Sequence, residues 1–66
     1  MVRVVLLPEG RVVELGKRKM RVDELLRELG LSVESAVVLR GDEPLFEWEV
    51  VGEDEEVRVM RAVSGG

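Results

Sequence analysis

The sequence predicts an α+β domain in which a mixed four- to five-stranded sheet packs on one helix. Three observations lead to this expectation. Apolar side chains alternate with a period of two at both ends of the chain, a segment between them has helical spacing, and 66 residues allow a single small domain. Because the chain contains no cysteine, its stability must come from packing of the helix on the sheet rather than from disulfides.

A β-hairpin is predicted at the N-terminus. Residues 2–7 (VRVVLL) alternate as a half-buried strand does, and the segment PEGR at residues 8–11 is typical of a turn. Residues 12–15 form the return strand, which ends at Gly16. The basic run at residues 17–19 is interpreted as a solvated turn rather than a docking patch.

A helix is predicted over about residues 22–29. Apolar side chains recur there at the spacing of one helical face, namely Val22, Leu25, Leu26 and Leu29. Asp23 and Glu24 fall in the first turn, where the helix dipole favours negative charge. Gly30 can adopt the left-handed conformation that ends a helix, and Leu31 is then placed to fold back on the last turn.

The next segments are predicted as short strands joined by a crossover. Residues 36–39 (AVVL) are almost continuously apolar, as in a central strand covered on both faces or nearly so. Pro44 restricts a short strand at residues 45–46 to the edge of the sheet or to a position where a strand starts. Trp48 is expected to plug the core beneath an irregular crossover, from which residues 50–51 lead into an acidic turn.

The last strand is predicted at residues 57–61. Its side chains alternate, with two valines on one side and Arg58 and Met60 on the other. To close the core over a single helix, this strand must lie beside the first one and parallel to it. The resulting arrangement is the β-grasp fold, the architecture of ubiquitin, with a domain at residues 1–61 and a tail at residues 62–66.

The charge of the chain is distributed unevenly. Residues 1–33 carry seven basic and five acidic side chains, whereas residues 34–66 carry three basic and nine acidic ones. The acidic second half argues against direct nucleic-acid binding; it suits a basic groove on a protein partner, or simply solubility. No apolar run approaches the ~20 residues of a membrane span, and the strand pattern begins at once, so we expect a cytoplasmic monomer without a signal peptide.

The composition offers little for catalysis. The three serines, at positions 32, 35 and 64, have no histidine to activate them, and imidazole and thiolate metal ligands are absent. The acidic run at residues 53–56 lacks the ligand spacing of a calcium loop, and no glycine-rich phosphate loop is present. We therefore predict that the chain is not an enzyme and has no catalytic residue, no metal site and no bound cofactor.

The terminal carboxylate is then the remaining reactive group. The chain ends in RAVSGG (residues 61–66). A carboxylate must be converted to an activated form, such as an acyl adenylate, before sulfur or an amine can attack it. Ser64 and Gly65 are small enough to thread a narrow slot leading to ATP, and Gly66 presents an unhindered carbonyl. The alternative is that the two glycines are a disordered end or a cloning scar.

With these motifs the chain resembles the ubiquitin-like sulfur carriers. The similarity runs nearly end to end and includes VDELLRELGL (22–31), VVLRGDEPL (37–45) and EDEEVRVMRAVSGG (53–66). It is most similar to the prokaryotic carriers for 2-thiouridine-type tRNA thiolation and to the small archaeal ubiquitin-like modifiers. The thiamine and molybdopterin sulfur carriers look more distant. Relatives often have an Asp-Gly-Asp-like turn before the last strand, where this chain has Gly52-Glu53-Asp54.

The resemblance implies that a ubiquitin-activating-type adenylyltransferase uses ATP to adenylate Gly66. The product would become a thiocarboxylate that donates sulfur to a sulfurtransferase such as a tRNA thiolase, or would form an isopeptide bond with target lysines; the sequence does not separate the two. The resemblance also implies docking through the exposed sheet face, at Arg58, Met60 and Phe46. A β-grasp interaction module with an accidental Gly-Gly end is a third alternative.

Overall fold

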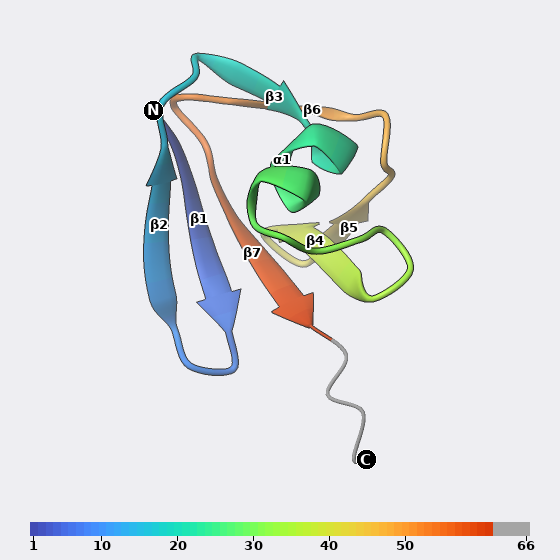
Figure 1. Cartoon of the computed structure of the whole chain (residues 1–66). Helices are drawn as coiled ribbons and strands as arrows, with labels where there is room; N and C mark the ends of the chain where they lie inside the picture. Colours follow the sequence, from blue (N-terminus) through green and yellow to red (C-terminus); the bar gives the residue numbers. More distant parts are fainter. Residues whose placement is uncertain (62–66) are drawn as a thin grey trace.

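The computed structural model describes residues 1–61, so the predicted tail at residues 62–66 lies outside the described residues. Within residues 1–61 the elements are β1 (Val2–Leu7), β2 (Arg11–Leu15), β3 (Lys19–Arg21), α1 (Val22–Glu28), β4 (Ala36–Arg40), β5 (Glu43–Leu45), β6 (Val50–Gly52) and β7 (Glu56–Arg61) (Figure 1). β2, β1, β7, β4 and β5 form a five-stranded sheet in that order, and β3 pairs with β6 in a separate two-stranded sheet.

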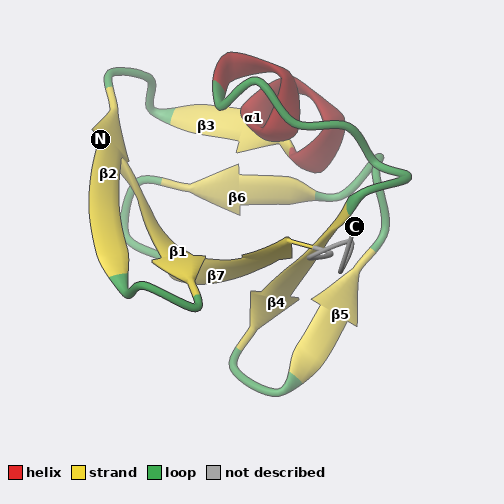
Figure 2. Cartoon of the chain, turned by 60° about the horizontal axis from the view of Figure 1, so that its bottom comes forward, coloured by secondary structure: helices red, strands yellow, loops and turns green. Residues whose placement is uncertain are grey.

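The first and last strands of the chain lie side by side in the middle of the large sheet. β1 pairs in parallel with β7, with Val4 opposite Val57, and antiparallel with β2. The other edge of β7 pairs antiparallel with β4, and β5 closes the sheet beyond it. Helix α1 packs over one face of this sheet (Figures 1 and 2). A mixed sheet on one helix with this strand order is the β-grasp fold that the sequence predicts.

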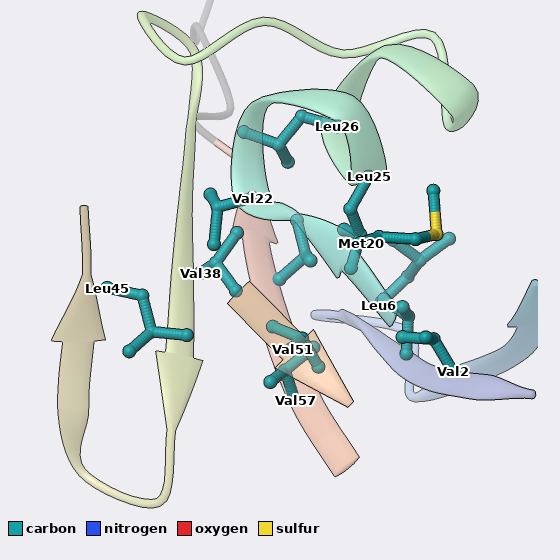
Figure 3. Packing of buried hydrophobic residues seen from close by; sticks show 12 residues of the cluster. Val2, Leu6, Met20, Val22, Leu25, Leu26, Val38, Leu45, Val51 and Val57 are labelled. Carbon is teal, nitrogen blue, oxygen red and sulfur yellow. The ribbon is translucent and has the colours of Figure 1, made fainter. Parts of the chain in front are cut away.

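The core lies between α1 and the inner face of the sheet. Alternate residues of β1 and β7 point into it, because successive side chains of a strand face opposite sides. Figure 3 shows this cluster, whose buried members within residues 1–61 are Val2, Val4, Leu6, Met20, Val22, Leu25, Leu26, Val38, Leu45, Val51, Val57 and Val59. The predicted alternation in the first and last strands is therefore confirmed.

The C-terminal end of α1 is closed as the sequence predicts. Gly30 has φ +75°, and its N–H donates to the carbonyl of Arg27 at 3.0 Å. The N–H of Leu31 reaches back to the carbonyl of Leu26 at 2.8 Å. These two bonds define a Schellman motif, which satisfies carbonyls that the helix itself leaves without a partner.

The N-terminal end of α1 is closed by a distant loop. Arg21 occupies the capping position, but its side chain makes no capping hydrogen bond. Instead, the N–H of Val22 donates to the carbonyl of Glu49 at 2.9 Å, and the N–H of Asp23 donates to that of Glu47 at 3.0 Å. The loop between β5 and β6 thus supplies the acceptors that a serine or aspartate cap supplies elsewhere.

The expectation for Trp48 was wrong. Its side chain is 60% exposed, and the space beneath the crossover is filled by Met20 of β3 and Val51 of β6, which lie opposite each other in the small sheet (Figure 3). Lys19, expected at the end of a solvated turn, begins β3, and neither β3 nor β6 is predicted from the sequence. A pair of three-residue strands is too short to give a clear period-two signal.

β4 is also less enclosed than the sequence suggested. Val38 is 1% exposed, but its neighbour Val37 is 47% exposed, so the strand is covered on one face only. The physical reason is that residues 1–61 form one helix, which can cover one side of the sheet. β5 is an edge strand as expected from Pro44, although it ends before Phe46.

No helix within residues 1–61 is long and apolar enough to cross a membrane.

Truncation of Leu26 should destabilise the domain strongly. The side chain is 1% exposed, and Leu26→Ala should lower the free energy of unfolding by about 2–5 kcal/mol. Val12→Ala is the control, because Val12 is 56% exposed and should change the same quantity by less than about 0.5 kcal/mol. Urea denaturation followed by circular dichroism measures both. Equal losses in the two variants would contradict the assigned core.

Candidate functional site

The tail begins at the end of the central strand. β7 is hydrogen-bonded on both edges, to β1 and to β4, and its last residue, Arg61, lies opposite Ala36. Gly66 is predicted to react, and Ser64 and Gly65 are predicted to pass through a narrow slot. All three residues lie outside the described residues. What the structure provides is their starting point, which is fixed by two neighbouring strands.

The end of β7 is also tied to the first hairpin. Nη2 of Arg61 donates to Oε2 of Glu9, in the turn between β1 and β2, at 2.6 Å. The pKa of Glu9 is lowered, first by a hydrogen bond from its own backbone N–H and then by the Arg61 guanidinium. An exposed ion pair adds little stability, but this one gives Arg61 a second contact besides its strand pairing. Arg61 is the root of the tail, because residues 62–66 follow it.

The sheet face opposite α1 is open and partly apolar beside that root. Met60 is 49% exposed and lies between Leu7 of β1 and Val37 of β4 in the strand register. A shallow hollow of about 350 Å³ adjoins it, with an apolar lining that includes Val33, Ala36, Val37, Leu39 and Met60, and with Arg61 at its margin. The hollow can accept an apolar side chain of another protein close to where the tail begins.

Arg58 lies two residues before Met60 on the same face of β7. Its guanidinium donates to the carbonyl of Gly41 and lies 3.7 Å from the Asp42 carboxylate, so it is directed toward the turn between β4 and β5. The two residues of the predicted docking face that lie on β7 are therefore neighbours. Their roles in docking stay predictions.

Phe46, the third residue of the predicted docking face, lies across β4 from β7. Because Leu45 is opposite Val38, Phe46 follows at the level of Val37. Its ring stacks on that of Trp48, with centroids 4.9 Å apart and planes 3° from parallel. The exposed position of Trp48 differs from the prediction. Its two glutamate neighbours gave no signal of it, because Met20 also lies between two charged residues and is 1% exposed.

The acidic turn before β7 contains a structural carboxylate. Oε1 of Glu55 accepts the N–H of Gly52 at 2.8 Å, and Oε2 accepts Nη1 of Arg40 at 2.8 Å. The pKa of Glu55 is lowered, first by the Gly52 N–H and then by the Arg40 guanidinium. Glu55 thus links the turn to β4 and sets the entry of β7. Within residues 1–61 no three acidic side chains are arranged to hold a metal ion.

Comparisons with known proteins agree over almost the whole chain. Residues 1–63 match the protein family described as small archaeal modifier protein 2. Sulfur carrier protein TtuB of Thermus thermophilus is 47% identical over an alignment of 66 residues. This alignment covers 97% of this chain and 98% of that protein. Both matches include β7 and the turn that leads into it.

Glu55→Gln should weaken the fold in a pH-dependent way. At neutral pH we expect a loss of about 1 kcal/mol in the free energy of unfolding at this half-exposed site, because the glutamine amide has one acceptor oxygen for the two donors and no charge to attract the Arg40 guanidinium. The pKa of Glu55 in the folded state lies below its ordinary value of 4.5, so its stabilisation is complete above the pKa of the unfolded chain and is lost as the pH falls through the folded value.

The loss should therefore shrink when urea denaturation is repeated at about pH 3. Asp54→Asn, in the same turn, is the matched control and should change the free energy of unfolding little at either pH. A loss for Glu55→Gln that stays constant between the two pH values would contradict the role assigned to this carboxylate.

Proposed function

Because the chain belongs to the small archaeal modifier protein 2 family of ubiquitin-like carriers, we propose that it is a sulfur carrier that works through the carboxylate of Gly66. The resemblance predicted from the sequence is confirmed by the family match and by the 47% identity to a sulfur carrier protein. This family consists of small carriers and modifiers, so the chain is a co-substrate of other enzymes and not an enzyme itself.

The proposed chemistry begins with activation of the carboxylate. An oxygen of the Gly66 carboxylate attacks the α-phosphorus of ATP in the site of an adenylyltransferase, and pyrophosphate leaves. The terminal sulfur of a persulfide on a sulfur donor then attacks the acyl carbon, and AMP leaves. A second thiol attacks the donor sulfur of the resulting acyl disulfide, which forms a disulfide with the donor and releases the thiocarboxylate. Transfer of this sulfur to an acceptor, with water supplying the oxygen, returns the carboxylate. Gly65 and Gly66 have no Cβ, which suits a narrow entry to such a site.

The observation that best supports the proposal is the place where the tail begins. β7 is held on both edges and ends at Arg61, five residues before the carboxylate of Gly66. Beside this point lies the open hollow that contains Met60 and Val37. An activating enzyme can therefore bind the sheet face and receive the terminal carboxylate at the same time, which lowers the entropy cost of placing the reactive group.

As the sulfur acceptor we propose a tRNA base of the 2-thiouridine type, reached through a tRNA thiolase. The acidic second half of the chain, with nine acidic and three basic side chains in residues 34–66, fits contact with a protein rather than with the RNA itself. In this arrangement the thiolase would hold the nucleic acid, and the carrier would supply only the tail.

Conjugation to lysines is the second candidate function. The matching family is described as a modifier protein, and the same Gly66 carboxylate can be attacked by an amine once it is activated. Peptide mass spectrometry of cellular proteins distinguishes the two: remnants of Gly66 on lysine side chains support conjugation, and their absence leaves the carrier role alone.

Deletion of Gly66 should abolish the activity. With the activating enzyme of the same organism, ATP and a sulfur donor, the full chain should gain the mass that corresponds to replacement of one oxygen by sulfur, as seen by intact-mass analysis. The variant that ends at Gly65 should show no such gain, although circular dichroism should report the same fold. Failure of the full chain to gain sulfur with that enzyme would refute the carrier function.

Met60→Glu should weaken docking without affecting the chemistry. We expect KM for the chain in ATP–pyrophosphate exchange to rise about tenfold, equivalent to ~1.4 kcal/mol, because a carboxylate replaces an apolar contact. The value of kcat should stay the same. Val50→Glu, at an equally exposed valine of β6, is the control and should leave KM unchanged. Equal effects in both variants would contradict docking through this face.

A further inference from the structure

The two aromatic side chains of the chain form one exposed unit. Phe46 and Trp48 are its only aromatic residues, and they are 62% and 60% exposed. Their rings lie 4.9 Å apart between centroids and within 3° of parallel. Each ring therefore covers one face of the other and leaves its outer face accessible. A small domain gains most from burying its largest apolar side chains, so an exposed aromatic pair indicates a contact with another molecule.

The loop that carries the pair is firmly held. The N–H of Phe46 donates to Oε2 of Glu49 at 2.7 Å, and the N–H of Glu49 donates to the carbonyl of Phe46 at 3.1 Å. The carbonyls of Glu47 and Glu49 accept the first N–H groups of α1. Figure 2 shows the loop running from the end of β5 past the helix to β6. The backbone that presents the rings is therefore set before any partner arrives, which reduces the entropy lost on binding.

The sequence around the pair is acidic. Trp48 lies between Glu47 and Glu49, and residues 41–57 contain no lysine or arginine. Aromatic ring faces carry negative potential, and the nearby carboxylates add to it. The side chain that fits both features is arginine, because its planar guanidinium stacks on an aromatic face and also donates to a carboxylate.

The pair lies at the end of the sheet from which the tail leaves. Phe46 is level with Val37, and Val37 is opposite Met60, one residue before the end of β7. A second hollow, of about 220 Å³, is lined by Phe46 and shares Val33, Ala36 and Val37 with the hollow beside Met60. An apolar strip therefore connects the root of the tail with the aromatic pair, and one partner surface can cover both.

We propose that the Phe46–Trp48 pair binds an arginine side chain of the enzyme that activates Gly66, as an anchor separate from the tail. This inference rests on the proposed function, since it concerns the same partner. A second copy of the chain fits the pair less well. Self-association would bring Glu47 and Glu49 of both copies together, and like charges in an interface oppose binding.

Variants of Trp48 test the anchor through the KM for the chain in ATP–pyrophosphate exchange with the activating enzyme of the same organism. Trp48→Leu removes the aromatic face but keeps an apolar side chain, and it should raise KM about tenfold with kcat unchanged. Trp48→Phe keeps an aromatic face and should stay within about twofold of the wild type. Val12→Leu, at an exposed position of β2, is the control for a surface apolar exchange.

An unchanged KM for Trp48→Leu would overturn the proposal, because the contact would then be absent or merely apolar. An equal rise for Trp48→Leu and Trp48→Phe would also overturn it, because binding would then not depend on an aromatic face. Thermal unfolding of each variant confirms that the domain is folded. Sedimentation of the chain alone is the further check. Self-association that disappears in Trp48→Leu would assign the pair to a second copy and would also overturn the proposal.

A direct measurement separates failure of this anchor from failure of the proposed function. Trp48 is the only tryptophan, so fluorotryptophan gives a single ¹⁹F resonance at this site. Addition of the activating enzyme without ATP should shift and broaden that resonance, and Glu47→Gln should weaken the binding. A shift without any adenylation of Gly66 would refute the carrier function and keep the anchor. Adenylation without any change of the resonance would refute the anchor alone.

Discussion

The structure depends on one constraint, namely that a helix of seven residues must cover a five-stranded sheet. The helix can do so on one face only. Placing β7 between β1 and β4 concentrates the buried valines beneath it, and the small sheet of β3 and β6 fills the remaining space with Met20 and Val51. Among the residues that the structure describes, none forms a second helix that covers the opposite face. The open sheet face near the tail is thus a consequence of the way in which the core is built.

The same constraint explains the role of the loop between β5 and β6. A short helix has few internal hydrogen bonds, so the acceptors for its first N–H groups matter to it. Glu47 and Glu49 supply them from their backbone carbonyls. These two hydrogen bonds hold the loop against the N-terminal end of the helix. The side chain of Trp48, which lies between the two glutamates, is thereby left outside the core. The helix end and the exposed aromatic pair therefore have a common structural cause.

Much of the fold could be predicted from the sequence because its main elements carry strong local signals. The alternation in β1 and β7, the helical spacing around Leu25 and the glycine after α1 each have a direct physical meaning, and together they predict that the last strand lies beside the first and parallel to it. The sequence did not reveal β3 and β6, because three residues do not establish a period. It also did not reveal the position of Trp48, which depends on Met20 and Val51 having already filled the core.

Part of the candidate site could also be predicted. The period-two alternation of the last strand places Arg58 and Met60 on the outer face of the sheet. The stacking of Phe46 on Trp48 could not be predicted, because it depends on the tertiary course of the loop between β5 and β6.

The position of β7 has a mechanical consequence. A force applied to the C-terminus pulls β7 along its own axis, between its parallel neighbour β1 and its antiparallel neighbour β4. The load falls on both ladders of hydrogen bonds in shear, so many bonds must break together rather than one after another. Resistance to such a pull depends on the unfolding rate and not on equilibrium stability. This arrangement resists unfolding when force is applied at the C-terminus, where the proposed reactive group lies.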